Sequence, residues 1–139
     1  MLLELKINNL VLIEDVHLDL DKGFVVFTGE TGAGKSLLVR AIKLLLGEKG
    51  GSNYIRPGAK EGEIEALIWG GEKLFQKLQE LGYSPHEEIH VRRIFSSNRQ
   101  KIYINGSPVT LNELSKITKD LIILTSQRVL YPFVLRKTA

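Results

Sequence analysis

Residues 29–36 read Gly29-Glu30-Thr31-Gly32-Ala33-Gly34-Lys35-Ser36, which fits the pattern Gly-x-x-x-x-Gly-Lys-Ser. The glycines let the backbone curl tightly, so that successive N–H groups point inward and form a nest for a β-phosphate. Lys35 can reach the β- and γ-phosphates, which makes it a candidate catalytic residue, and the Ser36 hydroxyl can bind Mg²⁺. The pattern therefore predicts a loop that binds a nucleoside triphosphate, and we expect ATP with Mg²⁺.

The sequence on both sides of the loop supports this prediction. Residues 24–28 are apolar on both faces, as in a central strand covered on two sides. Residues 36–46 are nearly all apolar and predict a buried helix, which Gly47 ends. The helix adds its positive N-terminal end to the phosphate site. No base-reading pattern such as Asn-Lys-x-Asp occurs, so the residues leave both ATP and GTP open. The expected nucleotide-binding residues are Gly29, Glu30, Thr31, Gly32, Ala33, Gly34, Lys35, Ser36 and Leu37.

The rest of the chain predicts several strands and two further helices. Alternating or apolar runs predict strands at residues 3–7, ending at Asn8-Asn9, and at residues 16–20, 63–68, 89–95, 102–104 and 121–124. Helical spacing covers residues 74–81, and Thr110-Leu111-Asn112-Glu113 matches a capping box that opens a helix. Residues 89–104 predict a hairpin, and Asn105-Gly106 predicts a tight turn. The expected fold is an α/β P-loop NTPase lobe of the ABC type. Its phosphate-loop helix would pack between a mixed sheet and a smaller antiparallel sheet containing the hairpin.

Composition narrows the class further. The chain has 139 residues, 43% of them apolar, a net charge of +3 and no cysteine. The charge is too small to indicate nucleic-acid binding by itself, and the lack of cysteine excludes disulfides and thiolate metal sites. No apolar run is long enough to span a membrane, so we expect a cytoplasmic protein. The three histidines show no metal-ligand spacing.

Several motifs together resemble the RecN family of bacterial DNA-repair proteins, in the SMC-like branch of the ABC ATPases. The matching stretches are Leu5-Lys6-Ile7-Asn8-Asn9-Leu10, Asp19-Leu20-Asp21-Lys22-Gly23, Thr28 to Ser36, Ile55-Arg56-Pro57-Gly58-Ala59, Arg92-Arg93-Ile94-Phe95-Ser96-Ser97 and Tyr103-Ile104-Asn105-Gly106. The resemblance implies an ATPase head divided into two lobes by a coiled coil. It also implies a C-terminal lobe of the same protein, ATP-dependent engagement with a second subunit, DNA as partner of the whole protein, and association with the nucleoid.

The resemblance also implies roles for two residues outside the loop. Gln127 would bind Mg²⁺ and sense the γ-phosphate, although the family pattern His-Gly-Gln is replaced here by Thr125-Ser126-Gln127. Arg56 lies where related heads carry an arginine that approaches the γ-phosphate, so it is a candidate catalytic residue. Without the resemblance, Gln127 also fits an ordinary polar residue after a strand, and Arg56 also fits a solvent-exposed arginine in a loop.

Other motifs of a complete ATPase head do not occur in the 139 residues. No apolar strand ends in an acidic residue, as a Walker B motif requires, and no Leu-Ser-Gly-Gly-like signature is found. We therefore expect residues 1–139 to be the N-terminal lobe of such a head, a fragment that binds ATP and hydrolyses it negligibly alone, while the whole protein is an ATPase.

Two other functions remain open from the residues. One is a small phosphotransferase of the P-loop kinase type, and the other is a nucleotide-gated interaction module without catalysis. Arg92, Arg93, Arg99 and Lys101 cluster on the predicted hairpin and could contact DNA phosphates. Alternation along the strand, however, places Arg92 and Arg93 on opposite faces, which favours a solvated hairpin over a DNA-binding patch.

Overall fold

The computed structural model describes residues 2–10, 13–19, 32–119 and 121, and for residues 32–38 it describes the helix but not the side chains. These residues form one sheet with the strand order β2-β1-β3-β4-β5-β6, in which every described pairing is antiparallel. The strands are β1 (Leu2–Leu10), β2 (Ile13–Asp19), β3 (Glu61–Trp69), β4 (Glu88–Ser96), β5 (Gln100–Ile104) and β6 (Ser107–Pro108).

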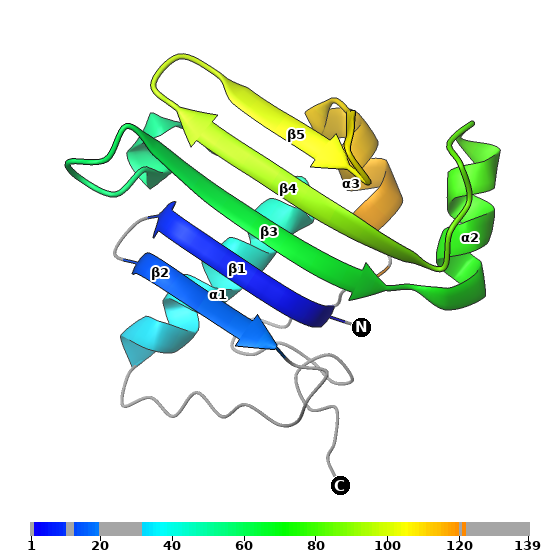
Figure 1. The fold of residues 1–139 in the computed structure, drawn as a ribbon, viewed down its shortest axis with the longest axis horizontal. Helices are drawn as coiled ribbons and strands as arrows, with labels where there is room; N and C mark the ends of the chain where they lie inside the picture. The colour runs from blue at the N-terminus through cyan, green and yellow to red at the C-terminus, as the bar shows by residue number, and fades with distance from the viewer. Residues whose placement is uncertain (1, 11–12, 20–31, 120, 122–139) are drawn as a thin grey trace, which may run out of the picture.

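The helices cover one face of this sheet. Figure 1 shows α1 (Gly32–Leu45) and α3 (Leu111–Thr118) behind the strands, while α2 (Gly71–Glu80) lies beside one end of the sheet. A short 3-10 helix, η2 (Ser52–Tyr54), follows α1. The strands accordingly alternate, since β3 buries every second residue from Gly62 to Ile68 and leaves the others half-buried or exposed. Such alternation is expected of an antiparallel sheet with one covered face.

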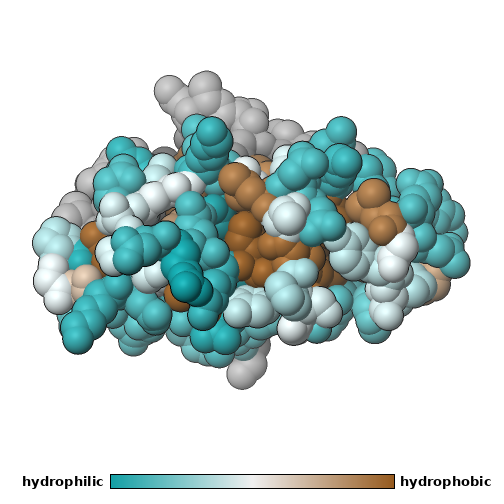
Figure 2. Space-filling view, turned by 90° about the horizontal axis from the view of Figure 1, so that it is seen from above, coloured by the Kyte–Doolittle hydropathy of each residue, from teal (hydrophilic) through white to brown (hydrophobic). Residues whose placement is uncertain are grey.

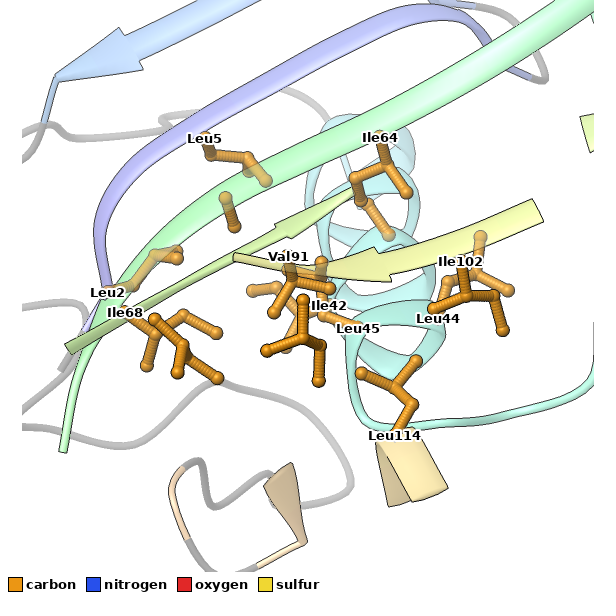
Figure 3. Close-up of a cluster of buried hydrophobic side chains, with 14 of the residues drawn as sticks. Leu2, Leu5, Ile42, Leu44, Leu45, Ile64, Ile68, Val91, Ile102 and Leu114 are labelled. Carbon is orange, nitrogen blue, oxygen red and sulfur yellow. The ribbon is translucent and has the colours of Figure 1, made fainter. Parts of the chain in front are cut away.

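The core lies between the covered face and the helices. Figure 3 shows Leu5, Ile64, Val91 and Ile102 of the sheet together with Leu44 and Leu45 of α1, within a larger group of buried side chains. Leu5, Ile64, Val91 and Leu45 have no exposed surface. Burying a side chain of this kind contributes about 1.5–3 kcal/mol, so this interface holds α1 against the sheet. From above, the described surface is mostly hydrophilic, with a hydrophobic area near the centre of the view (Figure 2).

Most of the predicted local structure is confirmed. The hairpin forms as β4 and β5, and Asn105 and Gly106 adopt the positive φ angles of the predicted turn, 51° and 86°. Thr110 and Glu113 form the predicted capping box of α3. Gly47 ends α1 with a φ of 94°. The strand predicted at residues 24–28 lies outside the described residues, and so does the strand predicted at residues 121–124 except for Leu121, which lies in a turn and donates its N–H to the Thr118 carbonyl at 3.0 Å. The expected mixed sheet depends on these two strands.

Three local predictions were wrong. Asn8-Asn9 does not end the first strand, because the strand pairs with β3 through Asn8 and, although Asn9 has a φ of 53°, continues to Leu10, which pairs with Ile13. The helix predicted at residues 74–81 spans Gly71–Glu80 instead, with Leu81 at its C-cap, and Phe75 and Leu81 are 36% and 38% exposed. Helix α1 begins at Gly32 and not at Ser36.

Candidate nucleotide-binding site

Helix α1 begins inside the predicted phosphate-binding loop. Its first residues are Gly32, Ala33, Gly34, Lys35 and Ser36, in that order. The first four N–H groups of an α-helix lack acceptors within the helix, so the backbone of this segment offers donors to an anion. No acidic residue lies in the first turn to repel one.

Except for Arg56, the remaining site predictions fall outside what the structure describes. Gly29, Glu30, Thr31 and Gln127 lie outside the described residues. The side chains of Lys35, Ser36 and Leu37 do so as well, although the backbone of these residues belongs to α1. The nucleotide contacts and the Mg²⁺ contacts predicted for them therefore stay predictions.

The C-terminal end of α1 is closed by backbone hydrogen bonds and by one buried side chain. The Glu48 N–H donates to the Lys43 carbonyl at 3.2 Å, and the Gly47 N–H donates to the Leu44 carbonyl at 3.3 Å. The Arg93 guanidinium also donates to the Leu44 carbonyl, at 2.7 Å. A positive group is favourable here because the C-terminal end of a helix carries partial negative charge.

Arg56 lies at the end of the segment that follows α1. Its N–H donates to the Asn9 carbonyl at 2.9 Å, and its Nη1 lies 3.7 Å from a carboxylate oxygen of Glu14. The two side chains are 38% and 75% exposed, so this ion pair is weak. The backbone of Arg56 is thus fixed to β1, while its guanidinium takes part in an exposed ion pair.

The structure changes the interpretation of the basic cluster on the hairpin. Arg92 lies on the open face and donates from Nε to Glu63 at 2.6 Å, and this hydrogen bond raises the pKa of Arg92. Arg93 is completely buried on the covered face. The alternation that separates the two arginines is confirmed, and Arg93 cannot contact DNA because no part of it is accessible.

The sequence named Arg93 only as a possible DNA contact, and it did not identify the buried role of Arg93 or its partner Gln100. Besides α1, Arg93 contacts the Gln100 side chain, which in turn donates to the Gly50 carbonyl at 2.8 Å. A signal was present, because Arg93 occupies a position on the strand face that otherwise carries Ile89, Val91 and Phe95. An arginine at a core position is rarely buried without a specific set of acceptors.

Two features are absent from the described residues. They contain no helix long and apolar enough to cross a membrane. They also contain no group of three or more His, Cys, Asp or Glu side chains that could hold a metal ion.

Comparison with known proteins identifies the family. A family model described as an AAA domain matches residues 4–132. The chain belongs to the AAA domain family. This assignment implies nucleotide binding. It agrees with the sequence pattern at residues 29–36 and with helix α1, which begins within that pattern.

The relatives of this AAA domain confirm the resemblance to RecN. The DNA repair protein RecN of Halalkalibacterium halodurans is 41% identical over 131 residues, and that of Bacillus subtilis is 36% identical over 131 residues. Each alignment covers 91% of this chain and 23% of the relative. The chain thus spans about a quarter of the length of the relatives that it matches.

Solved structures confirm the fold class. The AAA domain resembles an SMC ATPase structure with a TM-score of 0.66 at 21% identity, covering 85% of this chain and 77% of the other. It resembles the recombination mediator RecF bound to ATP with a TM-score of 0.64 at 19% identity, covering 82% and 30% of the two chains. At these identities the likeness concerns the fold.

Proposed function

We propose that this AAA domain binds ATP with Mg²⁺ through residues 29–37 and forms the N-terminal lobe of a RecN-like ATPase head that acts in DNA repair. The observation that carries the proposal is the start of α1 at Gly32, inside the Gly-x-x-x-x-Gly-Lys-Ser pattern. A helix start at this position directs unpaired N–H groups at the place where the pattern requires a phosphate.

Each polar residue of the site has a distinct role in this proposal. Lys35 bridges the β- and γ-phosphates as a compact positive charge, and the Ser36 hydroxyl binds Mg²⁺ together with Gln127. Arg56 exchanges the exposed Glu14 carboxylate for the γ-phosphate. An exposed ion pair contributes about 0–1 kcal/mol, so this exchange costs little.

The proposed partners follow from the relatives and from the structural neighbours. The relatives are named DNA repair proteins, and one neighbouring structure concerns ATP-driven dimerization and DNA-stimulated activation of SMC ATPases. By analogy, this lobe pairs with a C-terminal lobe of the same protein and engages a second subunit when ATP is bound. DNA is bound by the whole protein, which acts in the cytoplasm at the nucleoid. The RecN relatives give no support to a small phosphotransferase.

A lysine substitution tests the nucleotide site. We expect Lys35→Ala to weaken Mg-ATP binding at least about 100-fold, because a charge-assisted contact to phosphate is worth roughly 1.5–3 kcal/mol and Lys35 makes more than one. Titration calorimetry of the chain with Mg-ATP measures the loss. Lys43→Ala is the matched control, since Lys43 lies on the same helix, is exposed and sits in its last turn. Equal affinity of the two variants would show that ATP does not bind at this loop.

A further inference from the structure

Arg93 lies where three parts of the chain meet. Its Nη1 donates to the Leu44 carbonyl in α1 at 2.7 Å and to the Glu48 carbonyl after the helix at 2.8 Å. Its Nη2 donates to the Gln100 side chain in β5. A single guanidinium on β4 therefore contacts the phosphate-loop helix, the segment that follows it and the neighbouring strand.

The positive charge of Arg93 is buried without a negatively charged partner among the described residues. Within the described residues, no carboxylate lies at ion-pair distance from Arg93. The guanidinium carbon lies 4.9 Å from the centre of the Phe95 ring, and the other contacts are carbonyl or amide oxygens. Burial lowers the pKa of Arg93 to about 10, so the side chain stays charged at neutral pH. Carbonyls at the end of a helix and an aromatic face are the groups that stabilise such a cation.

The segment after α1 is fixed to the same strand pair by further contacts. Gln100 donates to the Gly50 carbonyl at 2.8 Å, and the Tyr54 ring stacks on Phe95 with 6.1 Å between the ring centres. Gly50 lies so close to Phe95 that a Cβ added to Gly50 would lie 2.5 Å from a ring carbon. Residues 48–54 are thus held by β4 and β5 at successive positions.

Both elements held by Arg93 lead to the candidate nucleotide site. Helix α1 extends from its contact with Arg93 back to Gly32, a distance of roughly 20 Å at 1.5 Å per residue. The segment after α1 leads to Arg56, whose N–H is bound to the Asn9 carbonyl. Figure 1 shows α1 crossing behind the sheet from the region of β5 toward that of β2.

We propose that Arg93 is a positioning residue that fixes α1 relative to residues 48–56, and thereby couples the β4–β5 hairpin to nucleotide binding. The proposal extends the proposed function, because it takes the N-terminal end of α1 as the nucleotide site. A displacement of the hairpin moves the guanidinium, and with it the two carbonyl groups that define where α1 ends. Nucleotide binding in turn stabilises the position of α1 and therefore of the hairpin, because coupling between two sites is reciprocal.

Arg93→Gln tests the coupling, and two other variants separate it from a general loss of stability. Arg93→Lys keeps the positive charge and can reach one of the two carbonyls. Leu78→Ala removes a buried side chain from α2, which lies beside the end of the sheet (Figure 1). Leu78→Ala therefore lowers stability by a change in a helix other than α1, outside the hydrogen bonds of Arg93. Mg-ATP affinity is measured by calorimetry and amide hydrogen exchange by mass spectrometry.

We expect Arg93→Gln to weaken Mg-ATP binding about tenfold or more and Arg93→Lys to recover part of the loss, while Leu78→Ala binds within about twofold of the unchanged chain. In the absence of nucleotide, Arg93→Gln should accelerate exchange in α1 more than in β1, whereas Leu78→Ala should not. Exchange in α1 that is no faster than in Leu78→Ala overturns the coupling, whether or not ATP binds. Failure of the unchanged chain to bind Mg-ATP would contradict the proposed function instead, and the exchange measurement would still decide the role of Arg93.

Discussion

At the scale of single residues, Arg92 and Arg93 show how the position in a strand determines what a charge does. Arg92 faces solvent and pairs with Glu63, and 43% of its side chain is exposed. Arg93 faces the core and donates to two main-chain carbonyls. The same residue type thus forms a surface ion pair at one position and holds a helix end at the next.

The two arginines should differ in their effect on stability. We expect Arg92→Gln to lower the free energy of unfolding by less than about 1 kcal/mol, because exposed ion pairs contribute little. Arg93→Gln should lower it by about 3 kcal/mol or more, because several buried hydrogen bonds to a charged group are lost. Urea denaturation of the two variants, which remove the same charge at adjacent positions, measures both values. A loss for Arg93→Gln as small as that for Arg92→Gln would contradict the described hydrogen bonds.

At the scale of elements, a four-residue sequence pattern determines where helix α3 begins. Glu113 donates its N–H to the Thr110 hydroxyl at 3.1 Å, and its carboxylate accepts the Thr110 N–H at 2.8 Å. Both partners lie three residues apart, so the pattern is readable without knowledge of the fold. The Tyr83 hydroxyl, from a distant part of the chain, adds a hydrogen bond to the same carboxylate.

The capping box should make stability depend on pH. The hydrogen bond from the Thr110 N–H, followed by that from Tyr83, lowers the pKa of Glu113 below its ordinary value of 4.5. The folded chain therefore binds this proton less readily than the unfolded chain, and the stabilisation is present above pH 4.5 and lost as the pH falls through the lowered pKa. We expect the stability difference between the unchanged chain and Glu113→Gln to shrink on acidification.

Thermal unfolding from pH 7 to pH 3 measures this difference. Glu80→Gln, which removes an exposed carboxylate at the end of α2, serves as the control. A difference for Glu113→Gln that stays constant over this range would show that the carboxylate does not accept these hydrogen bonds in solution.

At the scale of the whole molecule, the antiparallel sheet joins parts of the chain on both sides of the phosphate loop. Strand β1 precedes the loop and pairs with β3, which follows it, with Leu5 opposite Ala66 and Ile7 opposite Ile64. Helix α1 packs on the face that these strands share. Because residues 29–36 lie in the sequence between two paired strands of one sheet, a ligand on these residues should stabilise the entire fold.

We therefore expect Mg-ATP to raise the free energy of unfolding of the whole chain. At a free concentration of about 100 times the dissociation constant, the increase should be about 2.7 kcal/mol. Chemical denaturation followed by circular dichroism, with and without Mg-ATP, measures it. The increase should be absent in Lys35→Ala and unchanged in Lys43→Ala. A ligand that stabilises all three proteins equally would be binding elsewhere.

The sequence by itself determined the features that depend only on residues close together in the chain. The phosphate-loop pattern, the glycine at the end of α1, the turn at Asn105-Gly106 and the capping box at Thr110 each depend on residues close together in the chain. The alternation in residues 89–95 likewise predicts that Arg92 and Arg93 lie on opposite faces of their strand. The predicted turn, helix end, capping box and alternation hold because steric and hydrogen-bonding preferences act over a few residues, whereas the contacts predicted for the phosphate loop stay predictions.

Only the tertiary structure decided the roles that depend on distant partners. The sequence could not show that Arg93 meets carbonyl groups 45 and 49 positions away, or that Gln100 reaches Gly50. It also placed a strand end at Asn8-Asn9, where pairing with β3 keeps the strand extended through Asn8. The physical reason is that burial and strand pairing are properties of the assembled sheet. The sequence places Arg93 on a strand face of apolar residues, but only the packing of α1 against the sheet shows which carbonyl groups its side chain contacts.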